Sequence, residues 1–176
     1  GVLVLELGES AYGGQGRYAR VRGDATVHLV DAALVTGFEG GADTLMEKRV
    51  LPFDPEDIVG YEVRFGDKAG AFVHVDRAQA RTRRYAARED PTATREEAQK
   101  LINTVRSLRV QKLAQAGLAG SALASFKVET AERGVVLVEV LERTDGAGHL
   151  ARYGDWTGEL SETSHKELME DVAALF

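Results

Sequence analysis

An arginine-rich stretch holds the side chains that are best suited to bind a charged partner. Its five arginines, with one tyrosine among them, are Arg77, Arg81, Arg83, Arg84 and Arg88 together with Tyr85. The planar guanidinium group donates two hydrogen bonds at once, so it suits carboxylate and phosphate partners. From residue 77 to residue 112 the chain carries ten Lys/Arg against four Asp/Glu, although its overall net charge is −6. We predict that this basic stretch pairs with acids of the same chain or binds an acidic protein partner.

A nucleic acid is not an expected partner of these arginines. Domains that bind nucleic acid are usually basic as a whole, whereas this chain has an isoelectric point of about 5.3. Binding of another anionic polymer remains a weaker alternative, and its signature would be a steep dependence on salt.

His74 and Asp76 form a second candidate, because residues two apart on a strand lie on the same face. They could hold a metal ion or act as an acid–base pair, but we favour the interpretation that they lie on a solvated strand face. Together with acids such as Glu139, they define an alternative hypothesis, a hydrolase or small-ligand-binding domain. No histidine has a histidine partner at the spacing typical of zinc sites. We therefore predict no catalytic residue, no metal ion and no cofactor.

Two further features carry weaker signals. Glu6 and Glu139 lie within apolar strand patterns, where a buried carboxylate would have a raised pKa and could serve as a general acid; alternatively, both side chains point outward. The segment 8–16 is rich in glycine, but no Gly-Lys-Ser/Thr follows it. It therefore predicts a hairpin loop and not a phosphate-binding loop.

A block of sequence occurs twice and organises the elements around these residues. The chain begins Gly-Val-Leu-Val-Leu-Glu-Leu, and from residue 134 it reads Gly-Val-Val-Leu-Val-Glu-Val. Tyr-Ala-Arg at 18–20 corresponds to Leu-Ala-Arg at 150–152, and Leu-Met-Glu at 45–47 recurs at 168–170. We interpret this pattern as an internal duplication of a strand–strand–strand–helix element.

The order of the predicted elements indicates an α+β fold. Short strands follow one another through tight turns, so mostly antiparallel sheets with helices packed on one face are expected. A short helix is predicted over residues 42–49. The strongest helix pattern covers residues 95–108, with Thr94 as its N-cap, and a closing helix covers 164–175, with Ser164 as its N-cap.

Composition and length describe an ordinary globular chain. With 176 residues and 44% hydrophobic residues it can bury a core. We predict that residues 1–53 are the rear half of one repeat unit and residues 54–176 a full unit. The chain has no cysteine, and no apolar run approaches the length of a membrane span. Because it begins with glycine, we expect an excised fragment, with any membrane anchor in flanking sequence.

Several stretches resemble the bacterial domain-of-unknown-function 4340 (DUF4340) family. Residues 7–20, with their glycine loop and Tyr-Ala-Arg, are similar to its strand, loop and strand, and residues 26–30 are similar to its next strand. Residues 49–58, Arg-Val-Leu-Pro-Phe-Asp-Pro-Glu-Asp-Ile, look like the junction between its units, and the helix at 95–108 matches its central helix. The resemblance implies an extracytoplasmic, membrane-anchored accessory protein. Some members are associated with ABC-transporter components of the gliding-motility type.

These observations lead to one main hypothesis. The chain is expected to be a non-enzymatic binding or scaffold module, extracytoplasmic or periplasmic, that contacts a protein in a membrane complex. It would bind through the arginine-rich stretch or through the edges of its sheets, where self-association is also possible. The family has no established catalytic residues, so the resemblance assigns none to this chain.

Overall fold

The computed structural model describes residues 4–14, 16–39, 47–77, 83–114 and 119–176. The chain divides into two compact units, residues 1–46 and residues 47–176, and each unit is described by itself. The predicted border at residue 53 concerns repeat units and stays a prediction. Residues 47–53 lie in the second compact unit, where the Val50 backbone N–H donates to the carbonyl of Leu108 at 2.9 Å and Leu51 is buried.

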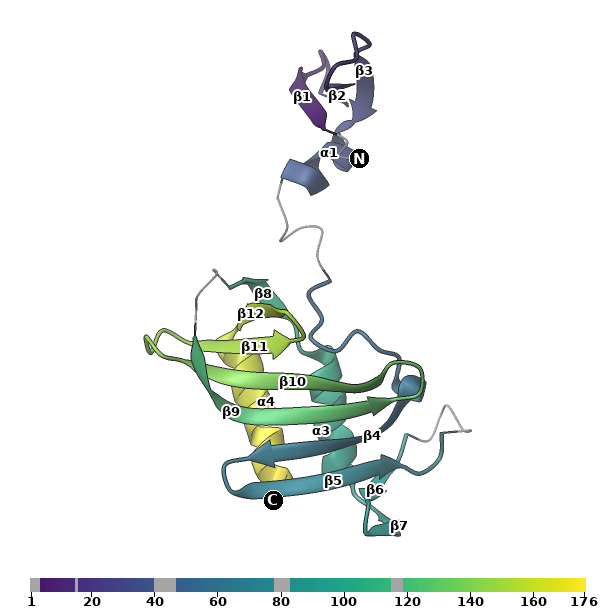
Figure 1. Cartoon of the computed structure of the whole chain (residues 1–176), viewed down its shortest axis with the longest axis vertical. Helices are drawn as coiled ribbons and strands as arrows, with labels where there is room; N and C mark the ends of the chain where they lie inside the picture. The colour runs from purple at the N-terminus through teal and green to yellow at the C-terminus, as the bar shows by residue number, and fades with distance from the viewer. Residues whose placement is uncertain (1–3, 15, 40–46, 78–82, 115–118) are drawn as a thin grey trace. The chain divides into compact units, whose positions relative to one another are not determined.

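Unit 1 is a small antiparallel meander followed by a short helix (Figure 1). Its elements are β1 (Leu5–Ser10), β2 (Gly16–Val21), β3 (His28–Asp31) and α1 (Ala32–Glu39). Gly13 and Gly14 take positive φ angles of 97° and 75° in the loop between β1 and β2, a backbone that favours glycine. A glycine hairpin loop is therefore confirmed, but it is shorter than the predicted 8–16, because residues 8–10 belong to β1 and Gly16 to β2. The Asp31 carboxylate accepts a 2.7 Å hydrogen bond from the backbone N–H of Ala33 and so caps the start of α1.

Unit 2 is built on one nine-stranded antiparallel sheet. Its strands lie in the order β7-β6-β5-β4-β9-β10-β11-β12-β8. The strands are β4 (Ile58–Phe65), β5 (Lys68–His74), β6 (Tyr85–Ala87), β7 (Asp90–Thr94), β8 (Val110–Leu113), β9 (Gly120–Thr130), β10 (Gly134–Arg143), β11 (His149–Tyr153) and β12 (Trp156–Leu160). A single 3-10 turn, η1 (Pro55–Asp57), leads into β4.

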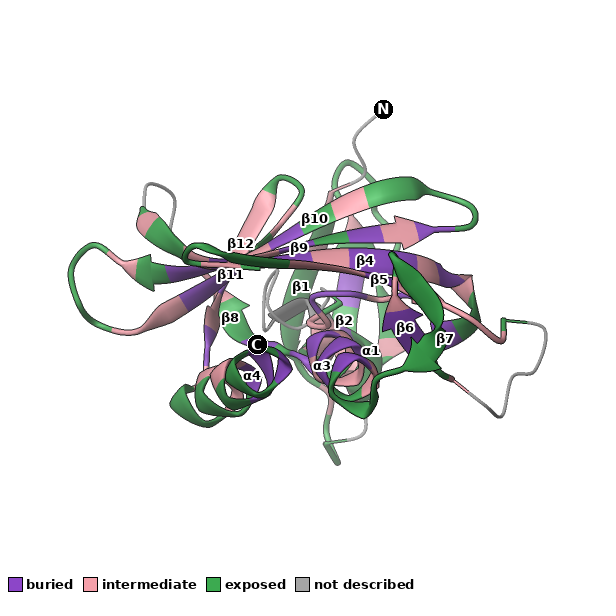
Figure 2. Cartoon of the chain, turned by 90° about the horizontal axis from the view of Figure 1, so that it is seen from below, coloured by how far each residue is buried: buried purple, intermediate pink, exposed green. Residues whose placement is uncertain are grey.

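The nine-stranded sheet consists of two four-stranded meanders that meet at its centre, with β8 added at one edge beside β12. One runs outward from β4 to β7 and the other from β9 to β12, and β4 pairs antiparallel with β9. Each meander is followed by a helix, α3 (Glu96–Ser107) and α4 (Glu162–Leu175) respectively. Figure 2 shows both helices on the same side of this sheet, with buried residues between the layers. The prediction of mostly antiparallel sheets with helices in an α+β arrangement is confirmed.

The two helices are anchored by apolar stripes and by one buried carboxylate. The α3 stripe is Ala98, Leu101, Ile102 and Val105, and the α4 stripe is Leu168, Val172 and Leu175. Between them lies Asp171, whose carboxylate accepts a 2.6 Å hydrogen bond from Thr104 Oγ1 and pairs with Lys100 Nζ at 2.7 Å. The hydroxyl of Tyr61 on β4 donates to the carbonyl of Ala98 at 2.7 Å, which fixes α3 to the sheet.

The predicted N-caps of the two helices are wrong by one and by three residues, whereas the predicted end of the closing helix at residue 175 is confirmed. Arg95, and not Thr94, occupies the N-cap of α3, because Thr94 still belongs to β7. Ser161, and not Ser164, caps α4: its oxygen accepts a 3.0 Å hydrogen bond from the Ser164 backbone N–H.

The predicted helix over residues 42–49 is not found in the part of that range that the structure describes. Residues 42–46 lie outside the described residues, and residues 47–49 are not helical, because Arg49 forms an isolated bridge with Arg109. The structure instead has α1 at residues 32–39, where we predicted no helix. Among the described residues, no helix combines the length and apolar character needed to cross a membrane.

Candidate functional site

The arginine-rich stretch divides into arginines that are paired and arginines that are not paired with acids. Arg84 forms a short ion pair with Asp76 across the start of β6, and Arg88 pairs with Glu129 of β9 at 2.6 Å. Arg81 lies outside the described residues. Among the described residues, pairing with acids of the same chain therefore holds for Arg84 and Arg88, and further along the basic stretch for Lys100 with Asp171 and for Lys112 with Glu159.

Three arginines, which we call the arginine surface, lie near the edge of the core at Tyr85. They are Arg77, Arg83 and Arg106. Arg106 Nε donates to the carbonyl of Phe53 at 3.2 Å, and Arg77 Nη2 donates to the carbonyl of Glu56 at 3.4 Å. Within the described part of the chain, none of the three forms an ion pair with a carboxylate within 4.0 Å.

The electrostatics of this surface show that like charges lie close together. The pKa of Arg106 is lowered first by burial and then by the nearby charge of Arg83. Asp54 and Glu56 oppose this effect more weakly. A surface that holds guanidinium groups near one another without direct carboxylate partners has hydrogen-bond donors left for an anion.

Tyr85, which we predicted beside the arginines as a binding residue, is a core residue. It is buried, its ring stacks on His74 at 4.9 Å between centroids, and it meets the ring of Tyr61 edge-on at 5.7 Å. Burial raises the pKa of Tyr85 to about 12, against the opposing charges of Arg106, Arg83 and Arg77. A tyrosine packed in this way positions strand β6, and it is not available to stack on a partner.

The proposed catalytic set of His74, Asp76 and Glu139 is not assembled. His74 Nδ1 meets the carbonyl of Ile58 at 3.1 Å, and Asp76 is held by Arg84. His74 lies on β5 and Glu139 on β10, with β4 and β9 between them. Because neighbouring strands are about 4.8 Å apart, the two side chains are separated by roughly 14 Å. Acid–base chemistry needs its groups within about 3 Å of a shared proton.

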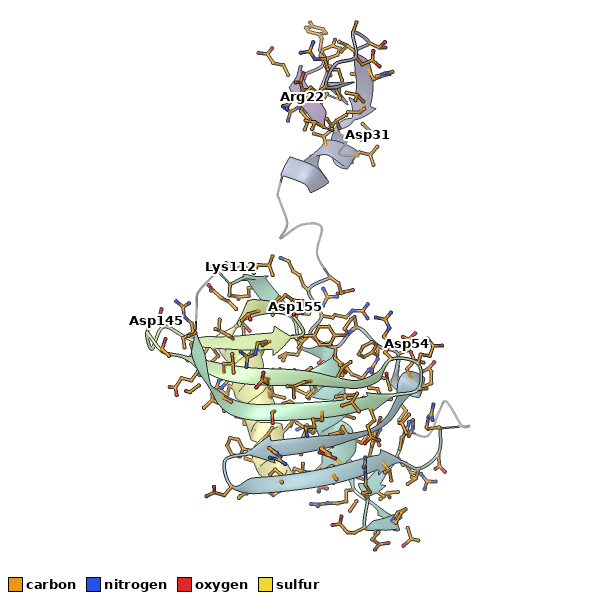
Figure 3. All side chains as sticks on the ribbon, viewed as in Figure 1. Arg22, Asp31, Asp54, Lys112, Asp145 and Asp155 are labelled. Carbon is orange, nitrogen blue, oxygen red and sulfur yellow. The ribbon has the colours of Figure 1, made fainter. Side chains whose placement is uncertain are left out.

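Glu6 and Glu139 each form a cross-strand ion pair with an arginine. Glu6 pairs with Arg20 at 2.7 Å and with Arg22 at 3.1 Å, the latter labelled in Figure 3. Hydrogen bonds from Arg20 and then Arg22 hold the pKa of Glu6 below its usual value. The alternative of a buried acid with a raised pKa is therefore wrong for Glu6. Glu139 accepts from Arg152 Nε at 2.7 Å in the same way.

Both ion pairs border shallow hollows on their sheets. One hollow, of about 360 Å³, includes Glu6, Tyr18 and Arg20, and the other, of about 340 Å³, includes Glu139, Arg152 and Tyr153. Neither hollow contains a serine, cysteine or histidine that could act as a nucleophile or base. They are surface depressions beside a satisfied ion pair.

Sequence reasoning missed a pair of stacked histidines. His149 on β11 and His165 on α4 place their ring centroids 3.3 Å apart, nearly parallel at 7°. Burial, and then the neighbouring His149, lower the pKa of His165, while Glu142 and Glu162 oppose the shift. The residues lie sixteen apart, and only the packing of α4 on the sheet joins them, so no local spacing signals the pair. No group of three or more metal-ligating side chains that could hold a metal ion occurs in the described ranges.

The structure thus defines a class of protein, an antiparallel α+β module. It carries the arginine surface, and several of its ion pairs join neighbouring strands. Residues 2–130 match the family model described as domain of unknown function (DUF4340), which covers more than half of the chain. The chain belongs to this family, and the resemblance carried by its strand, loop and helix residues is confirmed. No curated protein and no solved structure matches the chain.

Proposed function

We propose that this protein is a non-enzymatic binding module whose arginine surface contacts an acidic segment of a protein partner. The observation that carries this proposal is that Arg106 and Arg77 donate to the backbone carbonyls of Phe53 and Glu56 and, among the described residues, form no ion pair with a carboxylate within 4.0 Å. A partner carboxylate would offset the like charges of this surface and accept paired hydrogen bonds from the guanidinium fork.

The test uses the 176-residue chain and a fluorescent oligoglutamate peptide as the probe. We expect binding that weakens as salt rises, because exposed charges are screened beyond about 10 Å at 0.1 M ionic strength. Arg83→Glu should weaken binding about fivefold or more, since one lost charge pair is worth on the order of 1 kcal/mol. Arg64→Glu is the matched control, because Arg64 is exposed on β4 and makes the same change of charge elsewhere on the unit.

Three outcomes would contradict the proposal. They are equal affinities for the wild type and Arg83→Glu, equal weakening by Arg64→Glu, and a preference for a single-stranded oligonucleotide over the peptide. The last result would replace the protein partner by a nucleic acid.

We further propose that the module works outside the cytoplasm, as an accessory to a membrane complex of the ABC-transporter type. Membership of the family and the resemblance to transporter-associated members support this setting. A photo-crosslinking residue in place of Arg83, introduced into the full-length protein in its native cell, should capture a subunit of a membrane complex. A residue at position 64 should not, and equal capture at both positions would contradict the proposal.

We also propose that the chain contains an internal duplication. Unit 1 runs β1-β2-β3-α1, and the last part of unit 2 runs β10-β11-β12-α4 in the same order. The pairing register supports this equivalence: Glu6 faces Arg20 and Leu7 faces Ala19, as Glu139 faces Arg152 and Val140 faces Ala151. In both places the facing Glu and Arg form an ion pair.

The hydrolase alternative is not part of the proposal. Its residues His74 and Glu139 lie on strands that two other strands separate, and Asp76 is occupied by Arg84.

A further inference from the structure

The first turn of α4 packs on the sheet through fewer buried side chains than the rest of the helix does. Glu162 and Thr163 are exposed, and the buried stripe of α4 begins only at Leu168. His165 is half-buried and lies against His149 at the start of β11, with the ring centroids 3.3 Å apart and the ring planes 7° apart. The stacked histidines therefore join this turn of the helix to the sheet.

The surroundings of His165 suit a neutral imidazole. Its Nε2 atom is buried, and no hydrogen-bond partner for that atom occurs among the described residues. An imidazolium carries an N–H group on both nitrogens, so a protonated His165 would bury a charged donor without an acceptor. A proton on His149 as well would place two like charges at stacking distance, where their repulsion is strong.

Two carboxylates face the stacked histidines and oppose this effect. Glu142 on β10 stands opposite His149 in the pairing of β10 with β11, and Glu162 lies in the same helical turn as His165. Both are exposed, so solvent screens their attraction for a proton. Burial and the neighbouring His149 outweigh the two acids, and the pKa of His165 is lowered.

We propose that the stacked histidines are an acid-sensitive switch that holds the first turn of α4 on the sheet at neutral pH and lets it fray in mild acid. Rings that are separated and solvated bind protons more readily than the stacked rings do, so acid shifts the population toward the frayed state. The buried stripe from Leu168 onward and the contact of Asp171 with Thr104 hold the remainder of α4 in place. This switch goes beyond the proposed function and is independent of the arginine surface.

A spin label on the first turn of α4 tests the proposal. The chain has no cysteine, so Thr163→Cys places a single nitroxide label at an exposed position of this turn. Between pH 7.5 and pH 5.5, the range in which histidine titrates, the mobile fraction of its EPR spectrum should rise about twofold or more. Ala173→Cys is the matched control, because Ala173 is also exposed on α4 but lies beyond the buried Val172. Its spectrum should not change.

A variant without the second ring identifies the group that responds. In the Thr163→Cys background, His165→Gln should give a spectrum that does not change with pH. The proposal would be overturned by equal mobility of the Thr163→Cys label at both pH values, by an equal change at position 173, or by an unaltered pH response in His165→Gln.

An NMR titration of the histidine rings keeps the proposal testable if His165→Gln does not fold. The stacked rings of the wild type should titrate in two coupled steps. His149→Gln should raise the midpoint of His165, because the charge of the neighbouring ring no longer opposes its proton. His28→Gln is the control, since His28 lies on β3 of unit 1, and it should leave that midpoint unchanged. The same midpoint for His165 in the wild type and in His149→Gln would refute the switch.

Discussion

The meanders β1-β2-β3 and β10-β11-β12 share the same cross-strand pairs, but the burial of their apolar side chains differs. Both place a glutamate opposite an arginine and a small alanine opposite the next apolar residue. Val138 and Val140 of unit 2 are fully buried, whereas Leu5 and Leu7, which hold the corresponding places in unit 1, remain exposed. Strand pairing therefore does not by itself make a core. A core forms where a second meander brings another strand and another helix.

The largest effect on stability is expected when a buried aromatic ring is removed from unit 2. Phe126→Ala on β9 should lower the free energy of unfolding of unit 2 by about 3–5 kcal/mol, because Phe126 is fully buried where the meanders meet. Tyr12→Ala, on the exposed loop of unit 1, should leave stability nearly unchanged. Urea unfolding followed by fluorescence of Trp156 reports on unit 2, since this is the single tryptophan, and far-UV circular dichroism, followed in parallel, also reports on unit 1. Comparable losses in both variants would remove the contrast between the units.

A smaller effect is expected where β8 closes the edge of the nine-stranded sheet. A Cβ atom on Gly158 would lie 2.6 Å from the side chain of Val110. Gly158→Ala should therefore cost about 1–3 kcal/mol through overpacking. The cost of Gly158→Ala should be smaller in a Val110→Gly background, because Cβ, Cγ1 and Cγ2 of Val110 all lie within 2.7 Å of the added atom and only glycine removes all three. An equal cost in both backgrounds would show that this close approach does not determine the fit of β8.

The stacked histidines make the stability of unit 2 depend on pH. Burial and His149 depress the pKa of His165, so the folded state takes up its proton less readily than the unfolded state. The stability is then complete above the unfolded pKa of about 6.5 and falls as the pH drops through that value toward the folded pKa.

The measurement is the urea midpoint of Trp156 fluorescence at pH 7.5 and pH 5.5, for the wild type and for His165→Gln. The wild type should lose more stability at the lower pH than the variant does. Glu142 and Glu162 face His165 and oppose the effect, so Glu142→Gln should enlarge it. Identical pH profiles in the wild type and in His165→Gln would show that another group is responsible.

Features with local periodicity were predictable from the sequence. The helix at 96–107 follows from its apolar stripe, and the antiparallel sheets follow from short strands joined by turns. Helix α1 was missed because its sequence, Ala-Ala-Leu-Val-Thr-Gly-Phe-Glu, is apolar on most sides and lacks a polar face. The N-cap of α4 was predicted three residues too late because Ser161 and Ser164 are both plausible caps. Only the backbone shows which serine oxygen accepts the hydrogen bond from a helix N–H group.

The candidate site was less predictable, because its contacts are distant in sequence. The sequence shows that Arg88 is basic, but its pairing with Glu129 depends on strands forty-one residues apart. Tyr85 resembled a stacking residue because it stands among arginines, and only the fold reveals the ring of His74 against it. Residue types indicated which interactions each side chain can form, whereas three-dimensional packing determined which side chains already have a partner within the chain.

The buried Asp171 has a mechanical consequence. Its carboxylate on α4 binds Thr104 and Lys100 on α3, and these helices follow different meanders. Sliding one meander past the other would strip this carboxylate of its partners inside the core, at a large energetic penalty. A pull applied to either half of the nine-stranded sheet is therefore transmitted to the other half. Unit 2 should respond to load as a single stiff plate.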